Sequence, residues 1–182
     1  TNSTGTSSLT VTGTTGLGGD ITTSGSQNYI GAVTLSGGDR TLISSSGASI
    51  SVGELNGAYG ITISNASGAI ALGAIGQITP LTTITLLGSG LTTLTGDIAT
   101  SGPVDLRGTN RTMTFDLVDR TIDTTSRLGN GAITLGTTNS AYGLTLSSGS
   151  GTISLKGVGV SGDGMDATSL ASLTLRGTGT TN

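Results

Sequence analysis

The stretch AYGITISNASGAIALG, residues 58–73, has a close counterpart in AYGLTLSSGSGTISLKG, residues 141–157. In both, aliphatic residues alternate with Ser or Thr in short bursts, and Gly, Ser or Asn separates one burst from the next. Alternation with a period of two is typical of β-strands, and Gly and Asn favour turns because they accept a positive φ. The stretch therefore predicts short strands that are joined by tight turns and repeated along the chain.

The repetition extends over most of the sequence. Three further sets of segments match: LGGDITTSG (17–25) with LTGDIATSG (94–102), VTLSGGDRTL (33–42) with VDLRGTNRTM (104–113), and SLTVTG (8–13) with TITLLG (83–88) and SLTLRG (172–177). Since repeats at a fixed spacing indicate a repeat architecture, we expect one segment over residues 1–182. Its internal repeats would cover about 8–82 and 83–171, with the start of a third at 172–182. The chain opens within this pattern, which predicts a piece of a longer protein or a processed product.

Two segments of the second unit have no counterpart in the first. Residues 116–127 and 161–166 are extra, so we expect each to bulge from an otherwise regular fold or to add a strand to it.

Two architectures fit short strands at even spacing. A β-sandwich has such strands, but it usually needs a thicker core with several aromatic residues and does not require an internal repeat. A β-solenoid stacks short strands into turns that bury a few aliphatic residues along a narrow axis. Aromatic residues make up only 2% of this chain, which favours the solenoid. We expect an all-β, parallel β-solenoid of eight or nine turns, at roughly 18–25 residues per turn.

The alternation assigns side chains to the core. We expect eight aliphatic residues to point inward: Ile61, Ile63, Ile70, Leu72, Leu144, Leu146, Ile153 and Leu155. Thr62 and Thr145 would point outward, because successive side chains of a strand face opposite sides. The repeat places Tyr59 and Tyr142 at the same corner of equivalent turns. Asn56 and Asn139 also share a repeat position, and we expect them to satisfy backbone groups inside a bend.

The composition excludes several classes of function. There is no His and no Cys, so His-based triads, thiol nucleophiles and disulfides are absent. The net charge of −3 and seven scattered basic residues argue against nucleic-acid binding. No apolar run approaches the ~18 residues that a membrane helix needs. We therefore expect no enzyme activity, no nucleic-acid partner and no insertion into a membrane.

Several phrases resemble the repeats of the large filamentous-haemagglutinin-type surface proteins of bacteria. They are GDITTSGSQNYIGAVTLSGG (19–38), LNGAYGITISNASGAIALGAIG (55–76) and ATSLASLTLRGTG (167–179). The resemblance covers nearly the whole chain. It implies a right-handed parallel β-helix, export from the cell, and a place in an adhesin, a fibre or a stalk. It transfers no catalytic residue.

The densest charged stretch is FDLVDRTID, residues 115–123. Carboxylate pairs carry glycoside hydrolysis in other folds, but the opposite charges of this stretch nearly cancel. A solvated, ion-paired loop or an extra strand is the favoured interpretation, and a ligand surface is the alternative. The candidate ligand residues are Asp116, Asp119, Arg120, Asp123 and Arg127.

A second acidic stretch, SGDGMD (161–166), contains Asp163 and Asp166. Calcium prefers several oxygen ligands in a flexible loop, so these two residues are candidate calcium ligands. A plain loop is the favoured interpretation, because a calcium site normally has more carboxylates. We expect no other cofactor.

The sequence thus predicts a structural segment of an extracellular or cell-surface bacterial β-solenoid fibre, sheath or adhesin stalk. We expect it to continue covalently into further repeats or to associate head to tail with copies of itself. Two alternatives stay open: a glycan-binding adhesin module, and a β-helix carbohydrate-active enzyme. Exposed aromatic side chains would favour glycan binding, and the chain offers only Tyr29, Tyr59 and Tyr142.

Overall fold

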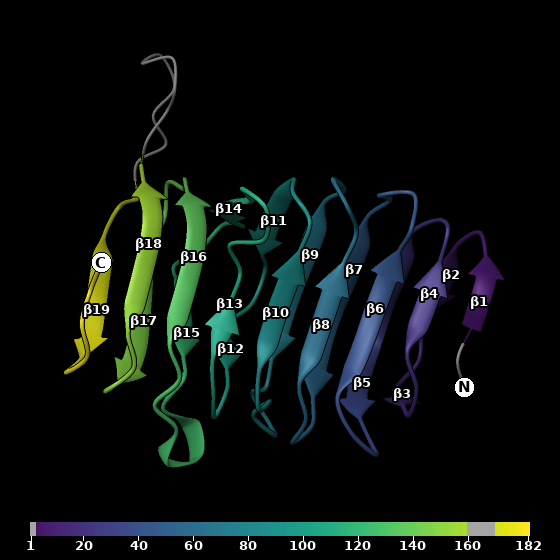
Figure 1. Ribbon diagram of the computed structural model, residues 1–182, viewed down its shortest axis with the longest axis horizontal. Helices are drawn as coiled ribbons and strands as arrows, with labels where there is room; N and C mark the ends of the chain where they lie inside the picture. Colours follow the sequence, from purple (N-terminus) through teal and green to yellow (C-terminus); the bar gives the residue numbers. More distant parts are fainter. Residues whose placement is uncertain (1–2, 160–169) are drawn as a thin grey trace.

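The computed structural model describes residues 3–159 and 170–182 and shows a parallel β-solenoid of about seven turns (Figure 1). The strands stack side by side along the longest axis, from β1 at the amino end to β19 at the carboxyl end. Within the described residues the helical structure is a single 3₁₀ turn, η1 (Ser126–Leu128). The expected β-solenoid is confirmed.

The solenoid has three faces, which the chain visits in the same order in each turn. Face 1 consists of β1 (Ser3–Thr6), β4 (Ile21–Thr23), β6 (Arg40–Ser44), β8 (Ile61–Ser64), β10 (Ile84–Leu87), β13 (Val104–Asp105) and the first parts of β16 (Ile133–Thr138) and β18 (Ile153–Val158). β-branched Ile, Val and Thr dominate these short strands, as expected for residues that pack well on a pleated surface.

Faces 2 and 3 complete each turn. Face 2 consists of β2 (Leu9–Val11), the first parts of β5 (Gln27–Leu35), β7 (Ile50–Asn56) and β9 (Ile70–Ile75), then β11 (Leu91–Leu94), β14 (Thr112–Phe115) and the last parts of β16 and β18. Face 3 consists of β3 (Thr15–Leu17), the last parts of β5, β7 and β9, then β12 (Ile98–Ala99), β15 (Arg120–Asp123), β17 (Leu144–Gly149) and β19 (Leu173–Gly177).

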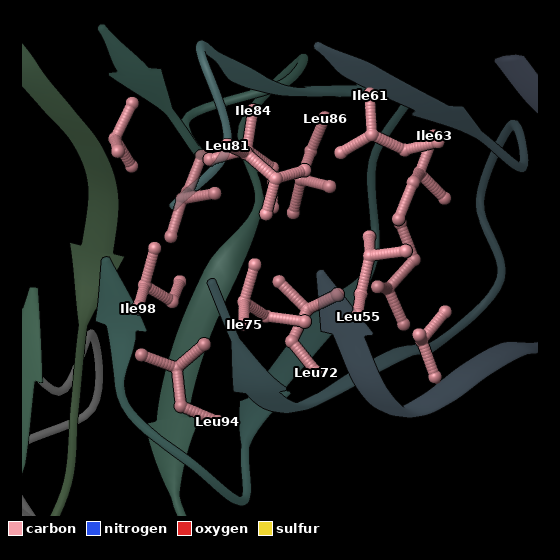
Figure 2. Close-up of a cluster of buried hydrophobic side chains, with 14 of the residues drawn as sticks. Leu55, Ile61, Ile63, Leu72, Ile75, Leu81, Ile84, Leu86, Leu94 and Ile98 are labelled. Atoms are coloured by element: carbon pink, nitrogen blue, oxygen red, sulfur yellow. The ribbon is translucent and has the colours of Figure 1, made fainter. Parts of the chain in front are cut away.

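Aliphatic side chains from all three faces fill the interior. Figure 2 shows Leu55, Ile61, Ile63, Leu72, Ile75, Leu81, Ile84, Leu86, Leu94 and Ile98 pointing toward one another. Seven of the eight residues predicted to point inward are buried, and Leu155 is half-buried. Thr62 and Thr145 lie between inward-facing neighbours and are half-buried, as the strand period predicts.

The sequence repeat does not return to the same face. The three matching starts form β2 on face 2, β10 on face 1 and β19 on face 3. From β2, three steps along face 2 reach β9, and two further faces lead to β10. The same count from β10 passes through β13, β16 and β18 and reaches β19. Each repeat therefore covers three full turns plus two of the three faces of a further turn. The next repeat consequently starts one face earlier in the turn.

This displacement corrects one expectation. Tyr59 precedes β8 on face 1, whereas Tyr142 precedes β17 on face 3. The two tyrosines therefore lie at different corners of the solenoid, not at the same one.

The tight corners of the solenoid move with the repeat. In the first half, β7 and β9 cross from face 2 to face 3 without a loop, at Gly53 and Gly73. A side chain at Gly73 would overlap the carbonyl oxygen of Gly53 in the turn before. In the second half, β16 and β18 cross from face 1 to face 2 without a loop, at Gly136 and at Lys156, which stands at the same position in the next turn. The corner that is crossed without a loop has thus shifted by one face.

Candidate functional site

The charged segment predicted as an insertion is partly a regular piece of the stack. β15 pairs with β12 on one side and with β17 on the other, with Ile98, Ile122 and Leu146 in register. The segment leaves the regular outline after this strand, at η1, which projects from the rod in Figure 1. Arg120–Asp123 is therefore not an insertion, because its strand occupies the place that face 3 requires in that turn.

The hydrogen bonds of Asp119 and Arg120 go to backbone groups of neighbouring turns. Asp119 Oδ1 accepts a 2.7 Å hydrogen bond from the Gly143 N–H in the following turn. Arg120 Nε donates to the carbonyl oxygen of Leu94 in the preceding turn at 3.3 Å, and its terminal nitrogen donates to the Asp116 carbonyl at 2.9 Å. These two side chains connect three consecutive turns along the axis.

The side chains of the other three candidates, Asp116, Asp123 and Arg127, make no hydrogen bond with Asp119 or Arg120 within the described residues. Asp123 Oδ1 accepts from the backbone N–H and the hydroxyl of Thr125, at 2.7 and 2.6 Å. Asp116 and Arg127 are exposed, and Arg127 has a positive φ of 54° within η1. A ligand surface formed by these five residues stays a prediction.

The arrangement around Asp119 occurs a second time in the molecule. Asp39 Oδ1 accepts from the Gly60 N–H at 2.7 Å, and Arg40 Nε donates to the Leu17 carbonyl at 3.3 Å. A terminal nitrogen of Arg40 also donates to the Ser36 carbonyl. This pair lies at the corner before face 1, whereas Asp119 and Arg120 lie at the corner before face 3. We call each copy a corner clamp.

Each corner clamp includes one further aspartate from the turn before. Asp20 Oδ1 accepts from the Thr41 N–H at 2.8 Å, and Asp97 Oδ1 accepts from the Thr121 N–H at 2.9 Å. Four of the chain's carboxylates therefore satisfy backbone donors that the ladder between strands leaves open at a corner. Buried or half-buried backbone N–H groups need such partners, and a side-chain carboxylate supplies one where the strand pairing begins.

The alignment of the repeats did not reveal the corner clamps, although the sequence contains a signal for them. The triplet Asp-Arg-Thr occurs at residues 39–41 and again at 119–121. The repeat alignment instead matched 33–42 with 104–113, which paired Arg40 with Arg111. A search for identical charged triplets finds the pairing that the structure has.

Arg111, four residues before the charged stretch, is buried. It is 1% exposed, and its guanidinium donates to the Asn65 side-chain oxygen, to the Leu87 carbonyl at 3.1 Å and to the Gly68 carbonyl at 3.4 Å. Within residues 3–159 and 170–182 no carboxylate forms an ion pair with it, and burial lowers the pKa of the Arg111 guanidinium. Asn65 is itself buried.

The asparagine expectation is confirmed for Asn56. Its side-chain oxygen accepts hydrogen bonds from the N–H groups of Ile78 and Thr79 at 2.9 and 3.2 Å, and its amide donates to Glu54 at 2.8 Å. Asn56 thus fixes the bend between face 3 and face 1. The backbone N–H of Asn139 donates to the Met113 carbonyl at 2.9 Å.

The tyrosines provide no exposed aromatic platform. Tyr29 is 2% exposed, and its hydroxyl donates to Gln27 at 2.9 Å. Tyr59 and Tyr142 are half-buried against the core. Sugar recognition by a flat aromatic surface therefore has little basis in these three residues.

Metal ligands are not gathered in the described part of the chain. Among residues 3–159 and 170–182, no group of three or more acidic side chains is placed to hold a metal ion. The calcium candidates Asp163 and Asp166 lie outside the described residues, so that site stays a prediction.

The part of the chain that the structure describes contains no helix long and apolar enough to span a membrane.

No family model, no curated protein and no solved structure matches the chain. The architecture is compatible with β-helix repeat proteins in general.

Proposed function

We propose that this chain is a structural segment of an extracellular bacterial β-solenoid fibre, sheath or adhesin stalk. It would act as a spacer whose turns continue into further repeats or stack end to end on like units. The phrases that resemble filamentous-haemagglutinin-type repeats support the bacterial and extracellular part of this proposal. The geometry supports the mechanical part.

The observation that carries the proposal is the direction of the polar contacts. In both corner clamps the Asp and Arg side chains bond to backbone groups of the turns before and after, along the axis of the rod. Asn56 and the buried Arg111 also bond to neighbouring turns. In a solenoid the contacts between neighbouring turns hold the rod together, and these bonds add to the backbone ladder that resists separation of the turns. Charged groups used in this way stiffen a spacer.

The carboxyl end supports continuation into another turn. Within the described residues β19 pairs with β17 alone, and Leu173 and Leu175 are 38% and 39% exposed although they lie on the inward side of face 3. A strand with an unpaired edge and uncovered apolar side chains is suited to pairing with a further strand. The low overall charge leaves little repulsion against it.

The experiment is sedimentation velocity with the 182-residue chain over a wide concentration range, combined with negative-stain microscopy. We expect elongated oligomers that lengthen as the concentration rises. Leu175→Arg places a cation on the uncovered end and should shift the distribution to monomers, whereas Thr34→Arg, on the exposed side of β5, should not. A chain that stays monomeric at high concentration would refute end-to-end stacking.

A further inference from the structure

The rod has a ledge at the corner between faces 1 and 2. In the turn that contains β13 and β14, residues 106–111 form an open loop across this corner. In the next turn the partners of Asp105 and Thr112 are Thr134 and Thr137, which are separated only by Leu135 and Gly136. The corner is therefore wide in one turn and tight in the next two, and the wide loop overhangs the tight turns.

The ledge follows from the one-face displacement of the repeat. The corner that is crossed without a loop lies between faces 2 and 3 in the first half of the rod and between faces 1 and 2 in the second half. At the junction of the two halves the cross-section must change. The ledge is the place where this change leaves a hollow on the outside of the sheet.

The hollow has a volume of about 330 Å³, which is at the lower end of the range for small-ligand pockets. Its lining combines cations, amides and hydroxyls, among them Arg107, Asn110, Thr134, Ser154, Lys156 and Asn182. Thr134 and Ser154 lie next to each other in register on face 1, so they present two hydroxyls one strand apart.

Positive charge gathers at the ledge, although the chain as a whole is acidic. Lys156 is the only lysine of the sequence, and its Nζ donates to the Asn110 side-chain oxygen. Arg107 Nε pairs with Asp105 at 3.1 Å, while the terminal nitrogens of Arg107 make no hydrogen bond with the described residues. The side chains at the rim therefore carry two cations, Arg107 and Lys156, against the one carboxylate of Asp105, and both cations keep N–H donors available.

We propose that the ledge binds an acidic sugar unit of a glycan, with the sugar carboxylate between Arg107 and Lys156. A planar guanidinium with two available nitrogens suits a carboxylate. Asn110, Thr134 and Ser154 match the hydroxyls of a sugar ring. A neutral sugar gains less, because the hollow has no aromatic side chain on which the ring could stack.

The test compares two ligands that differ in one group: methyl β-D-glucuronide and methyl β-D-glucoside. Binding to the ¹⁵N-labelled chain is followed by amide chemical shifts. We expect saturable shifts of residues 107–110, 134 and 154–156 with the glucuronide. The glucoside should bind about tenfold more weakly, because a charge-assisted hydrogen bond is lost. Raised salt should weaken the binding of the glucuronide.

Four variants locate the binding. Arg107→Gln and Lys156→Gln, both at exposed positions, should each weaken glucuronide binding several-fold, and the double variant about tenfold or more. Arg127→Gln removes the same charge from η1, away from the ledge, and should leave the affinity unchanged. Circular dichroism should show that all four fold normally.

Several results would overturn the proposal. Equal affinity for glucoside and glucuronide would show that the cations do not select a carboxylate. An equal loss of affinity in Arg127→Gln would show unspecific attraction. Inorganic sulfate that binds as tightly as the glucuronide would show that the sugar ring contributes nothing. Shifts that do not saturate would show that no site exists. Binding of an acidic sugar at the ledge does not depend on end-to-end stacking of the rod. If either proposal failed its test, the other would still stand.

Discussion

The two corner clamps allow the same prediction, a loss of stability on removal of the aspartate, to be tested twice in one protein. Asp39→Ala removes the acceptor of the Gly60 N–H, and Asp119→Ala removes the acceptor of the Gly143 N–H. Both hydrogen bonds are 2.7 Å long, and both glycines are buried, so each variant leaves a buried donor without a partner. Hydrogen bonds to charged groups contribute about 1.5–3 kcal/mol, and an unpaired buried donor costs about 1–3 kcal/mol.

The expected loss is smaller than the upper end of this range. Both aspartates are exposed to water, which screens their charge and can replace part of the bond. We therefore expect each variant to lower the free energy of unfolding by about 1–2 kcal/mol, by equal amounts within the error. Asp39→Asn keeps a side-chain oxygen and should recover part of the loss.

The assay has a global and a local readout. Urea unfolding, followed by circular dichroism, gives the loss of stability. Because solenoids can open turn by turn, amide hydrogen exchange of Gly60 and Gly143 reports each clamp separately. Protection of Gly60 should fall in Asp39→Ala, and protection of Gly143 should fall in Asp119→Ala.

Asp116→Ala is the matched control. Its side chain is exposed, and only its backbone carbonyl takes part in the second clamp, so its stability should change by less than about 0.5 kcal/mol. If Asp39→Ala and Asp116→Ala proved equally stable, the carboxylates would contribute nothing to the clamps. A loss in only one of the two clamps would show that they are not equivalent.

Two further predictions concern the interior. Ile63→Ala and Leu146→Ala should each lower the free energy of unfolding by about 2–5 kcal/mol, since both side chains are fully buried. Leu155→Ala should lower it less, because Leu155 is half-buried. Unchanged urea midpoints in Ile63→Ala and Leu146→Ala would contradict the packing. Burial raises the pKa of the Tyr29 phenol, so above pH ~10 the unfolded chain releases a proton that the folded chain keeps. Stability should then fall as pH rises, by up to about 1.4 kcal/mol per pH unit, and Tyr29→Phe should flatten this slope in urea unfolding measured between pH 9 and 11; an equal slope in both proteins would contradict the assignment.

The strands and their inward faces could be predicted from the sequence because both depend on local rules. The alternation around Ile61 and Ile63 is a property of three consecutive residues, and Gly or Asn at the turns acts through its own φ. Such signals survive even when the number of residues per turn varies. For this reason the parallel solenoid and most of its core follow from the sequence.

The positions around the axis could not be predicted in the same way. Whether Tyr142 lies at the corner of Tyr59 depends on the lengths of all the turns between them, and small differences in loop length add up. Arg111 shows a second limit. An arginine is almost never fully buried without a partner, and its burial depends on Asn65, Gly68 and Leu87, which come from two earlier turns.

The displacement by one face has a consequence for any longer rod built from this unit. The starts at β2, β10 and β19 already occupy all three faces in turn. A fourth unit that kept the same count of turns would return to face 2, the face of the first start. Features made by one unit, such as a corner clamp, would therefore wind around the rod instead of lining one side. A rod of this kind has no preferred lateral face for sheet-like packing, but it presents its surface features in every direction, which suits a fibre or stalk that stands free of its neighbours.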